Sequence, residues 1–508
     1  MKKRKIVVIG GGSVGWMTAL FIKKMYDIDG DVTLIESEDI GILGAGEGST
    51  PNFPGMLNFL GIDFKEFLIK TNATHKLGIS FINWNGDGKT YHHPFGNYNL
   101  KYNWTVKENM PKLTKYIGYL YKNDTSHEEC ILSNRLSNSN LSPLLRQQDE
   151  NGAENSVDYG FHFDANLVAK YLRKVAERRK IKRIEGIVTG FKLDDSENIK
   201  KIILKDGQRI DADFVFDCSG FNRLVLGKLY KTDWISYADS LKVTAALTFQ
   251  LPQDVGYIKP YTKSIAMKYG WMWMIPLQNR IGCGYNFDEK FTTIDEAKAE
   301  VEEFFGTKIQ FNKVIPYNAG RFSKLWVKNC IAVGLSSGFV EPIEATSIFT
   351  SVNQLFSLDV PSIEKVIMGD TAISDDYNDN ASRFFDRTKD FLHFHYFTKR
   401  KDTEFWKTYY YTTTKSKELL EKIEKWKTEI PKQLDFDKEP FDLYNWVNVG
   451  LGLEFYDKNK FIENLSDSDY SSIEEWHNMQ EEYIAKIYKA SIDEVECIEL
   501  IKKIYYNG

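Results

Sequence analysis

Cysteine is scarce in this chain of 508 residues, and its placement excludes two common uses of the residue. The five cysteines are odd in number and free of any C-x-x-C pair, and they lie far apart at Cys130, Cys218, Cys283, Cys330 and Cys497. This pattern argues against a disulfide framework and against a zinc site. We therefore expect a protein of the reducing cytoplasm with no metal site.

Excess positive charge and long apolar runs are absent as well. The formal net charge is −5, which gives no reason to expect a nucleic-acid partner. No stretch approaches the roughly 18 uncharged apolar residues of a membrane span. The basic start MKKRK is followed by an apolar run that three glycines interrupt, unlike a signal peptide. With 42% hydrophobic and 27% charged residues, the composition is that of a soluble globular protein.

A nucleotide-binding pattern occupies the first forty residues, which read as strand, glycine turn, helix and strand. Gly10, Gly12 and Gly15 form G-x-G-x-x-G, with Ser13 inside the turn, and Glu36 closes the next strand. The glycines permit a tight turn, the helix N-terminus attracts pyrophosphate, and the carboxylate binds ribose hydroxyls. The pattern predicts a bound dinucleotide.

Two later stretches favour FAD over NAD. DCSGF at 217–221 and CIAVGLSSGFVEP at 330–342 each follow a strand with a glycine-containing loop. Three such loops converging from distant parts of the chain suit an extended ligand. The alternative is that they are only strand ends of one sheet.

Local patterns also indicate several individual elements. A strand enters a helix over 158–180, with Asp164 as a possible N-cap, and KDG at 205–207 is typical of a hairpin. A single helix is expected across 472–506. We expect the chain to fold as one unit, with an FAD-binding core that has sheet insertions (1–101 and 158–354) and a mostly helical substrate-binding part (102–157 and 355–508).

Nine stretches along nearly the whole chain carry a family resemblance: GGGSVGWMTA (10–19), GAGEGSTP (44–51), THKLGISF (74–81), YHHPFG (91–96), YGFHFDANLVAKYLR (159–173), DCSGF (217–221), GWMWMIP (270–276), FVEPIEATSI (339–348) and DFLHFHYFTKRKDTEFW (390–406). Together they resemble the flavin-dependent halogenases of the tryptophan-halogenase type. The resemblance implies an α/β fold of the aromatic-hydroxylase type. It has a Rossmann-like FAD core, β-sheet insertions and a helical C-terminal substrate-covering part.

The resemblance also implies a two-stage chemistry. A separate flavin reductase supplies FADH2, which reacts with O2 and halide to give hypohalous acid, and the acid passes internally to an aromatic substrate. Lys76 matches the catalytic lysine and Glu344 the catalytic glutamate. A desolvated amine can hold or bond an electrophilic halogen, and a carboxylate can take the ring proton. On residue type alone, Lys76 could be a solvated strand residue and Glu344 a helix cap.

Further matches surround the flavin. Thr346 and Ser347 match positions whose backbone amides bind halide, although the family usually has glycine at Ser347. This departure leaves the preference among chloride, bromide and iodide open. Flavin contacts are implied at Gly46, Glu47, Val188, Leu335 and Ile348, and the last three could equally be core positions.

Trp271 and Trp273 in GWMWMIP stand two residues apart, so in a strand both indoles face one side. The resemblance implies a wall that keeps the substrate from the flavin while the small acid passes. The alternative is an ordinary pair of core tryptophans.

The substrate side is implied by His93 and Phe95, which match an indole-sandwiching pair, and by Trp446, which lies in a region that supplies another stacking wall. The tyrosine-rich segment that grips free tryptophan is not recognisable between 430 and 456. We therefore expect an indole, phenol or other free aromatic substrate. His393 and His395 are interpreted as structural.

Two rival functions remain open at this stage. A flavin monooxygenase would oxidise NAD(P)H directly and need no halide. An inactive scaffold would bind FAD without forming product. A homo-oligomer is possible, since the C-terminal third is rich in helical patterns.

Overall fold

The computed structural model describes residues 4–26, 30–41, 46–96, 112–147, 154–254, 256–436 and 439–507. Residues 44 and 45, the first two of the second motif of the resemblance, lie outside this range. Part of the expected helical segment 102–157 also lies outside the described residues.

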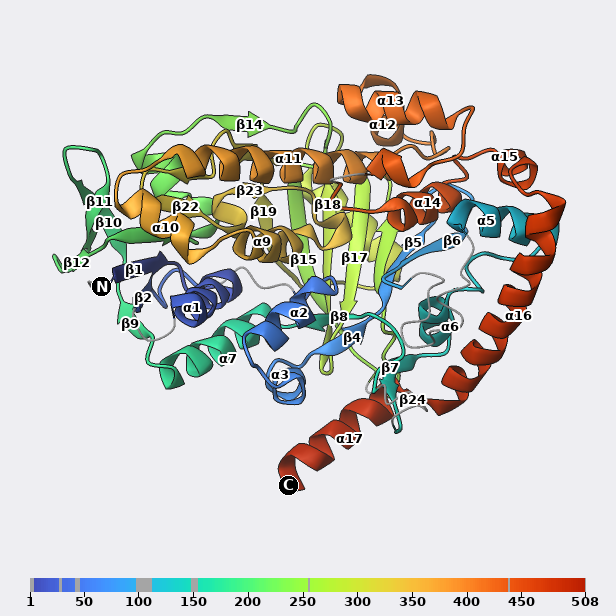
Figure 1. Ribbon diagram of the computed structural model, residues 1–508, viewed down its shortest axis with the longest axis horizontal. Coiled ribbons are helices and arrows are strands. Elements are labelled where there is room, and N and C mark those ends of the chain that lie inside the picture. The colour runs from blue at the N-terminus through green and yellow to red at the C-terminus, as the bar shows by residue number, and fades with distance from the viewer. Residues whose placement is uncertain are drawn as a thin grey trace.

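The nucleotide core is a six-stranded sheet in the order β21-β22-β13-β1-β2-β9. Its parallel strands are buried β-branched or aromatic runs, as expected for a sheet covered on both faces. Helices α1 and α7 lie side by side next to it (Figure 1). The bounds are β1 Arg4–Ile9, β2 Gly30–Glu36, β9 Lys182–Glu185, β13 Phe214–Asp217, β21 Trp326–Val327, β22 Cys330–Ala332, α1 Ser13–Tyr26 and α7 Ala165–Arg178.

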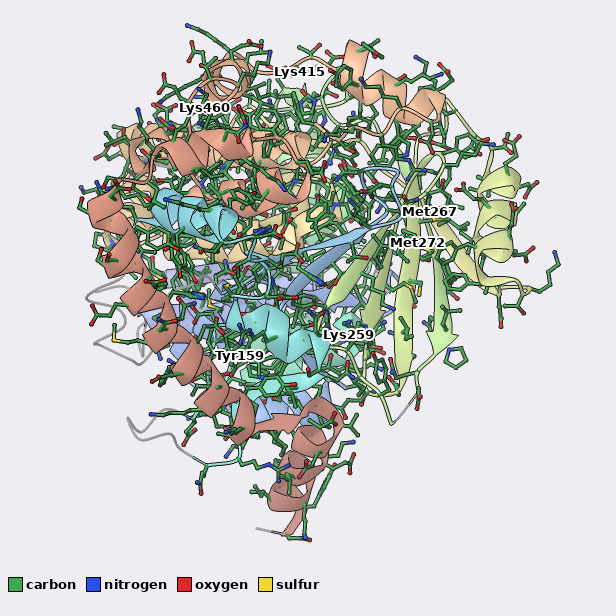
Figure 2. All side chains as sticks on the ribbon, turned by 90° about the vertical axis from the view of Figure 1, so that its right-hand side faces the viewer. Tyr159, Lys259, Met267, Met272, Lys415 and Lys460 are labelled. Atoms are coloured by element: carbon green, nitrogen blue, oxygen red, sulfur yellow. The ribbon has the colours of Figure 1, made fainter. Side chains whose placement is uncertain are left out.

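A seven-stranded sheet in the order β19-β15-β18-β17-β16-β5-β6 forms the centre of the molecule (Figure 1). Neighbouring strands are antiparallel except β16 and β5. In Figure 2, Met272 on β17 lies on the side of this sheet where α8 packs, in a separate apolar cluster. The bounds are β5 Gly78–Ile82, β6 Thr90–Pro94, β15 Ala245–Pro252, β16 Thr262–Ala266, β17 Gly270–Pro276, β18 Arg280–Phe287, β19 Phe311–Pro316 and α8 Ile294–Phe305.

A small sheet, β3-β8-β4, connects the nucleotide core with the central sheet. β8 (Gly160–Phe163) pairs on one side with β3 (Glu47–Gly48) and on the other with β4 (Thr74–Lys76). Lys76 is the last residue of β4, whose three residues are all buried.

The remaining described elements complete the frame. They are α2 Asn52–Phe59, α3 Phe64–Lys70, α5 Leu113–Lys122, α6 Leu132–Asn138, β7 Leu141–Leu145, β10 Val188–Leu193, β11 Ile199–Leu204, β12 Arg209–Asp211, β14 Trp234–Ser236, β20 Gly320–Phe322, β23 Gly338–Phe339, β24 Ser491–Asp493, and the short η1 Gly220–Asn222, η2 Leu224–Leu229, η3 Gly334–Ser336, η4 Pro342–Glu344 and η5 Gln433–Phe436.

Helices α11, α12, α13 and α14 lie along the upper side of the molecule in Figure 1, whereas α16 runs down its right-hand side and α17 lies at the bottom. None of the described helices is long and apolar enough to cross a membrane. The bounds are α9 Thr346–Phe356, α10 Val360–Ile367, α11 Ala372–Phe394, α12 Glu404–Thr412, α13 Lys417–Trp426, α14 Leu443–Gly452, α15 Lys458–Glu463, α16 Asp467–Ala490 and α17 Glu494–Asn507.

The local predictions are confirmed at two places. The Asp164 side chain accepts hydrogen bonds from the backbone N–H of Asn166 and Leu167, so it is the N-cap of α7. Strands β11 and β12 pair antiparallel across the KDG turn, where Gly207 has a φ of +87°. That backbone conformation is one that glycine adopts without strain.

The single helix expected across 472–506 is wrong. α16 ends at Ala490, and the next three residues form β24, which pairs with β7 before α17 begins at Glu494. The helix stops because Ser491 takes an extended conformation and the backbone pairs with a strand some 350 residues earlier in the chain. The residues of this segment carry no glycine or proline that would have signalled the break.

One hydrophobic cluster joins the nucleotide core to the C-terminal helices. It contains Trp16 of α1, Trp271 of the central sheet, Trp446 of α14 and Ile501 of α17, all buried. The division into an FAD-binding core and a helical substrate-binding part that fold as one unit stays a prediction, with which this continuous core agrees.

Candidate active site

The turn between β1 and α1 has the close backbone approach that a dinucleotide site needs. A Cβ at Gly10 would lie 2.2 Å from the Cys218 carbonyl oxygen, and one at Gly15 would lie 1.9 Å from the Gly10 oxygen. A Cβ at Gly12, in contrast, would meet no atom within 4 Å. Ser13 begins α1, whose first turn carries no acidic side chain. The open space therefore lies at a helix N-terminus suited to a phosphate.

Glu36 faces this turn from the end of β2. Its carboxylate lies so close to Gly11 that a Cβ there would be 1.5 Å from Oε2. Arg183 Nε donates to Glu36 Oε1 at 2.6 Å. Val188 begins β10 and packs against the apolar cluster on the outer side of the same sheet. This end of the sheet is where a ribose and adenine would lie in such a fold.

The other two glycine-containing loops meet beside the turn. Gly220 N–H donates to Ser336 Oγ at 2.9 Å, which ties the loop after β13 to the loop after β22. Leu335 lies in η3 within the second loop, and Gly334 N–H donates to Gln354 Oε1 on α9 at 3.1 Å. A Cβ at Gly220 would meet no atom within 4 Å. The chain thus has an extended open cradle that fits FAD.

Gly46 and Glu47 lie between the nucleotide core and the central sheet. Gly46 has a φ of +94°, and a Cβ there would lie 3.4 Å from Gly282 Cα. Burial raises the pKa of Glu47 to about 7, and the nearby charge of Asp164 adds to the shift. This glutamate can therefore hold a proton at neutral pH.

Lys76 is buried, with 1% of its surface exposed. The described residues offer its Nζ neither a hydrogen bond nor an ion pair. Nζ lies 5.0 Å from the centre of the Phe95 ring, and a Cβ on Gly48 would come within 3.1 Å of it. Burial lowers the pKa of Lys76 to about 7, while the charge of Glu344 opposes the shift. A substantial fraction of this amine is therefore neutral at pH 7.

Glu344 is equally buried but has close partners. Its Oε1 lies 2.9 Å from His93 Nδ1 and 2.7 Å from His395 Nε2. Burial raises the pKa of Glu344, but the charges and hydrogen bonds of the two histidines outweigh burial and bring it down to about 2. The carboxylate is ionised throughout the physiological range.

His395, interpreted from the sequence as structural, lies beside the candidate catalytic glutamate, and its role stays a prediction. His393 instead lies in the core, where its Nε2 is 3.0 Å from Thr413 Oγ1. His393 lies in the last turn of α11, which ends at Phe394, and His395 is the residue just beyond the helix.

Trp271 and Trp273 extend from the same face of β17, with ring centres 6.1 Å apart. Trp271 Nε1 donates to Glu341 Oε1. The indole of Trp273 lies over Gly284, and its buried Nε1 has no partner among the described residues. The two indoles form a continuous surface.

Sequence reasoning missed Glu341, the first glutamate of FVEPIEATSI. It is fully buried and also accepts a hydrogen bond from Tyr396 Oη. Burial raises its pKa to about 7, and the hydrogen bonds from Tyr396 and Trp271 oppose the rise. The signal that could have found it is its place three residues before Glu344 in the same motif.

Thr346 and Ser347 are the first two residues of α9, and Ile348 is buried behind them. The first N–H groups of a helix have no partner within it, so they can bind an anion. Ala345, between Glu344 and Thr346, is in the left-handed conformation with a φ of 56°. For a residue with a Cβ this conformation costs about 1 kcal/mol or more, and such strain is common at functional sites.

The substrate residues inferred from the resemblance lie in different surroundings. His93 is engaged with Glu344, and Phe95 faces Lys76. Trp446 is fully buried in an aromatic cluster, where its ring centre lies 5.1 Å from that of Phe391. Phe391 in turn lies 5.8 Å from the His93 ring, so Trp446 adjoins the site through one intervening side chain.

A pocket of about 340 Å³ opens beside this region, and no motif in the sequence predicts it. Tyr91, Glu128 and Leu451 are among the residues lining it. Tyr91 stacks on Phe81, and its buried Oη has no partner among the described residues. Burial raises the pKa of Glu128 to about 7, while a hydrogen bond from the His92 backbone opposes the shift.

A parallel sheet with a glycine-rich turn, joined to a large antiparallel sheet and a buried lysine–glutamate region, is the arrangement of an α/β flavoprotein. A sequence model described as tryptophan halogenase matches residues 5–464. The chain belongs to the tryptophan halogenase family and is a flavin-dependent halogenase, which confirms the family and the fold expected from its motifs.

Individual relatives agree with this assignment. Tryptophan 6-halogenase SttH of Streptomyces toxytricini is 32% identical over 456 residues, 84% of each chain. Its crystal structure superposes with a TM-score of 0.86 at 28% identity and covers 99% of this chain and 100% of that one. Tryptophan 7-halogenase RebH of Lentzea aerocolonigenes is 34% identical over 426 residues, 79% of this chain and 78% of its own.

Proposed function

We propose that the protein forms hypohalous acid from halide and O2 with electrons from FADH2, and that Lys76 delivers the halogen to a free aromatic substrate. When bound, reduced FAD would supply two of the four electrons that O2 takes up, and the halide would supply the other two as it becomes hypohalous acid. The glycines at 10, 12 and 15, Ser13 and Glu36 would hold the nucleotide end of FAD, and Leu335 and Ile348 would contact it from the other loops. The observation that carries the proposal is a buried lysine that has no ionic partner among the residues that the structure describes.

Lys76 can act in either protonation state. As a neutral amine, its lone pair attacks the halogen of hypohalous acid and gives a haloamine and water. As an ammonium ion, it donates a hydrogen bond to the oxygen of the acid. Because the pKa of Lys76 is about 7, roughly half of it is neutral at pH 7.

Glu344 completes the exchange at the aromatic ring. When the ring carbon takes the halogen, the ring becomes cationic and must lose a proton. Even a carboxylate whose pKa is about 2 can accept this proton, since a halogenated ring cation is far more acidic. Its charge also stabilises the cation as it forms.

The tryptophan pair separates the two stages. Trp271 is fixed by Glu341, and Trp273 by contact with Gly284, so neither indole rotates freely. A rigid aromatic wall between flavin and substrate lets a small acid pass while an organic molecule stays outside. Thr346 and Ser347 would bind the halide at the start of α9.

We propose an indole- or phenol-like substrate and a separate flavin reductase as the partner. SttH and RebH are named for tryptophan and for different ring positions. In this chain the tyrosine-rich segment that grips free tryptophan is not recognisable between 430 and 456, and within this range Asn445 contacts His93. The aromatic ring of the substrate would lie against Phe95 and His93. Trp446 would support this pocket from behind Phe391.

The test is mass spectrometry of reactions containing the protein, FAD, NADH, an unrelated flavin reductase, bromide and a panel of indoles and phenols. We expect a product with the paired bromine isotope peaks that Lys76→Ala no longer forms. Lys192→Ala, at an exposed strand position of β10, is the matched control and should keep the activity. Oxygenated products that do not need bromide would instead support a monooxygenase.

A further inference from the structure

We propose that Asn445, held by Asp442, is a positioning residue that fixes His93 as a ring donating hydrogen bonds from both nitrogens. In the proposed halogenation, this ring keeps the Glu344 carboxylate occupied, so that Lys76 remains free. The consequence for catalysis rests on the proposed function, but the hydrogen-bond assignment does not.

The orientation of the Asn445 amide is set from the helix side. Asn445 Nδ2 donates to Asp442 Oδ1 at 2.7 Å. A carboxylate only accepts hydrogen bonds, so the NH2 group must face Asp442. The amide oxygen of Asn445 then faces His93 Nε2, 2.9 Å away. Flipping the amide would set two oxygens against each other at Asp442.

Both ring nitrogens of His93 consequently face acceptors. Nε2 meets the Asn445 oxygen, and Nδ1 meets Glu344 Oε1 at 2.9 Å. A neutral imidazole has only one N–H, so one of these contacts would be repulsive. His93 is 2% exposed, so water cannot relieve the conflict. An imidazolium ion satisfies both contacts.

His395 contacts the same carboxylate oxygen of Glu344 as His93 does. Its Nδ1 lies 3.0 Å from the Phe391 carbonyl oxygen, and its Nε2 lies 2.7 Å from Glu344 Oε1. His93 as an imidazolium ion then donates one N–H to the buried Glu344 carboxylate and the other to the Asn445 oxygen. Asp442, which orients that amide, is exposed at the start of α14.

Lys76 and Tyr91 are the other described titratable groups whose pKa values the charge of Glu344 affects. Electrostatic attraction from Glu344 raises the pKa of Lys76, but the burial that lowers it is the larger effect. For Tyr91, burial and then the Glu344 charge raise the pKa well above its usual value, so the phenol stays neutral. With Glu344 already paired to two histidines, Lys76 gains little from it and keeps a neutral fraction.

The local sequence explains how α14 positions the amide. Asp442 is the N-cap of this helix and accepts from the backbone N–H of Asn445 at 3.2 Å. Asn445 is three residues further on, where a side chain reaches back to the cap. The helix start therefore fixes Asn445 before any substrate binds.

The test is nitrogen NMR of the protein labelled at its histidine rings, with the His93 signals identified as those missing from His93→Gln. We expect both His93 nitrogens to give imidazolium signals at pH 8. In Asn445→Leu we expect His93 to give neutral-ring signals at that pH, and Asn445→Asp should restore the imidazolium by returning an acceptor. Neutral-ring signals from His93 in the unsubstituted protein would overturn the proposal.

Asp457→Asn is the matched control, since Asp457 caps the neighbouring helix α15 and does not contact His93. It should leave the His93 signals unchanged. If Asn445→Leu does not fold, the spectrum of the unsubstituted protein still decides the protonation state.

A kinetic measurement separates this proposal from the proposed function. In Asn445→Leu, a neutral His93 leaves Glu344 free to stabilise the Lys76 ammonium, so the rising limb of the pH–rate profile, which reports the neutral amine of the haloamine route, should move to higher pH. By that route, bromination at pH 7 should fall about fivefold for the first unit of this shift and about tenfold for each further unit. Bromination with a neutral His93 would refute the positioning role alone. An imidazolium without any halogenation would refute the proposed function alone.

Discussion

Replacing Lys76 by methionine should stabilise the protein while abolishing halogenation. Methionine keeps the apolar stem of the side chain and removes the amine. Burial lowers the pKa of Lys76 from 10.5 to about 7. Each unit corresponds to about 1.4 kcal/mol, so an ammonium at this position costs the folded state about 4 kcal/mol at pH 7. The substitution removes that cost.

The effect has a defined pH dependence. Because the folded-state pKa lies below the unfolded-state value, the cost is complete below pH 7, where Lys76 is charged in both states. It decreases as pH rises from about 7 and vanishes above about 10.5, where the amine is neutral in both states. The stability gained by Lys76→Met should follow the same course.

Urea unfolding at pH 6, 7, 9 and 10.5 measures this difference, and FAD binding and bromination are assayed on the same samples. Lys192→Met, at the exposed strand position, should change stability by less than about 0.5 kcal/mol at every pH. A Lys76→Met protein that is less stable than the unsubstituted one at pH 7, or whose gain does not depend on pH, would refute the assignment of an unpaired buried amine.

Three further predictions test other parts of the site. Gly12→Val should leave the melting temperature unchanged and abolish FAD binding, measured by flavin fluorescence, because its side chain would fill open space; Gly15→Val should unfold the protein, since its Cβ would collide with the Gly10 carbonyl. Glu344→Gln should keep FAD and lower bromination by about 10²-fold or more, because it removes the ring-proton acceptor; unchanged single-turnover rates would contradict that role. Ser347→Gly should alter the ratio of brominated to chlorinated product in mixed halide, because it removes the side chain at the start of α9; an unchanged ratio would place halide elsewhere.

The sequence predicted those features that depend on neighbouring residues. The glycine turn after β1, the Asp164 cap and the hairpin at Gly207 are each defined within a few residues, so their geometry follows from local chemistry. The break after Ala490 could not be found in this way, because it depends on pairing with β7 from a distant part of the chain.

The site was predictable only in part for the same reason. Lys76 and Glu344 stand in motifs that identify them, but their environments come from the fold. His395 lies 51 residues from Glu344 in the chain, and Asn445 lies 352 residues from His93. Neither residue stands in a pattern that predicts a polar contact. Only packing of α14 and the end of α11 against β6 brings them together.

Lys76 and Glu344 are chemically complementary, yet the fold satisfies only one of them. Glu344 has two histidine partners, whereas the Lys76 amine has no ionic partner among the described residues. Pairing the two directly would be the simplest way to bury both charges, and it would hold the lysine as an ammonium ion. Because two histidines contact the Glu344 carboxylate instead, the Lys76 amine remains available to react with hypohalous acid. The histidine pair is therefore as necessary to the proposed chemistry as the lysine, although it touches no halogen.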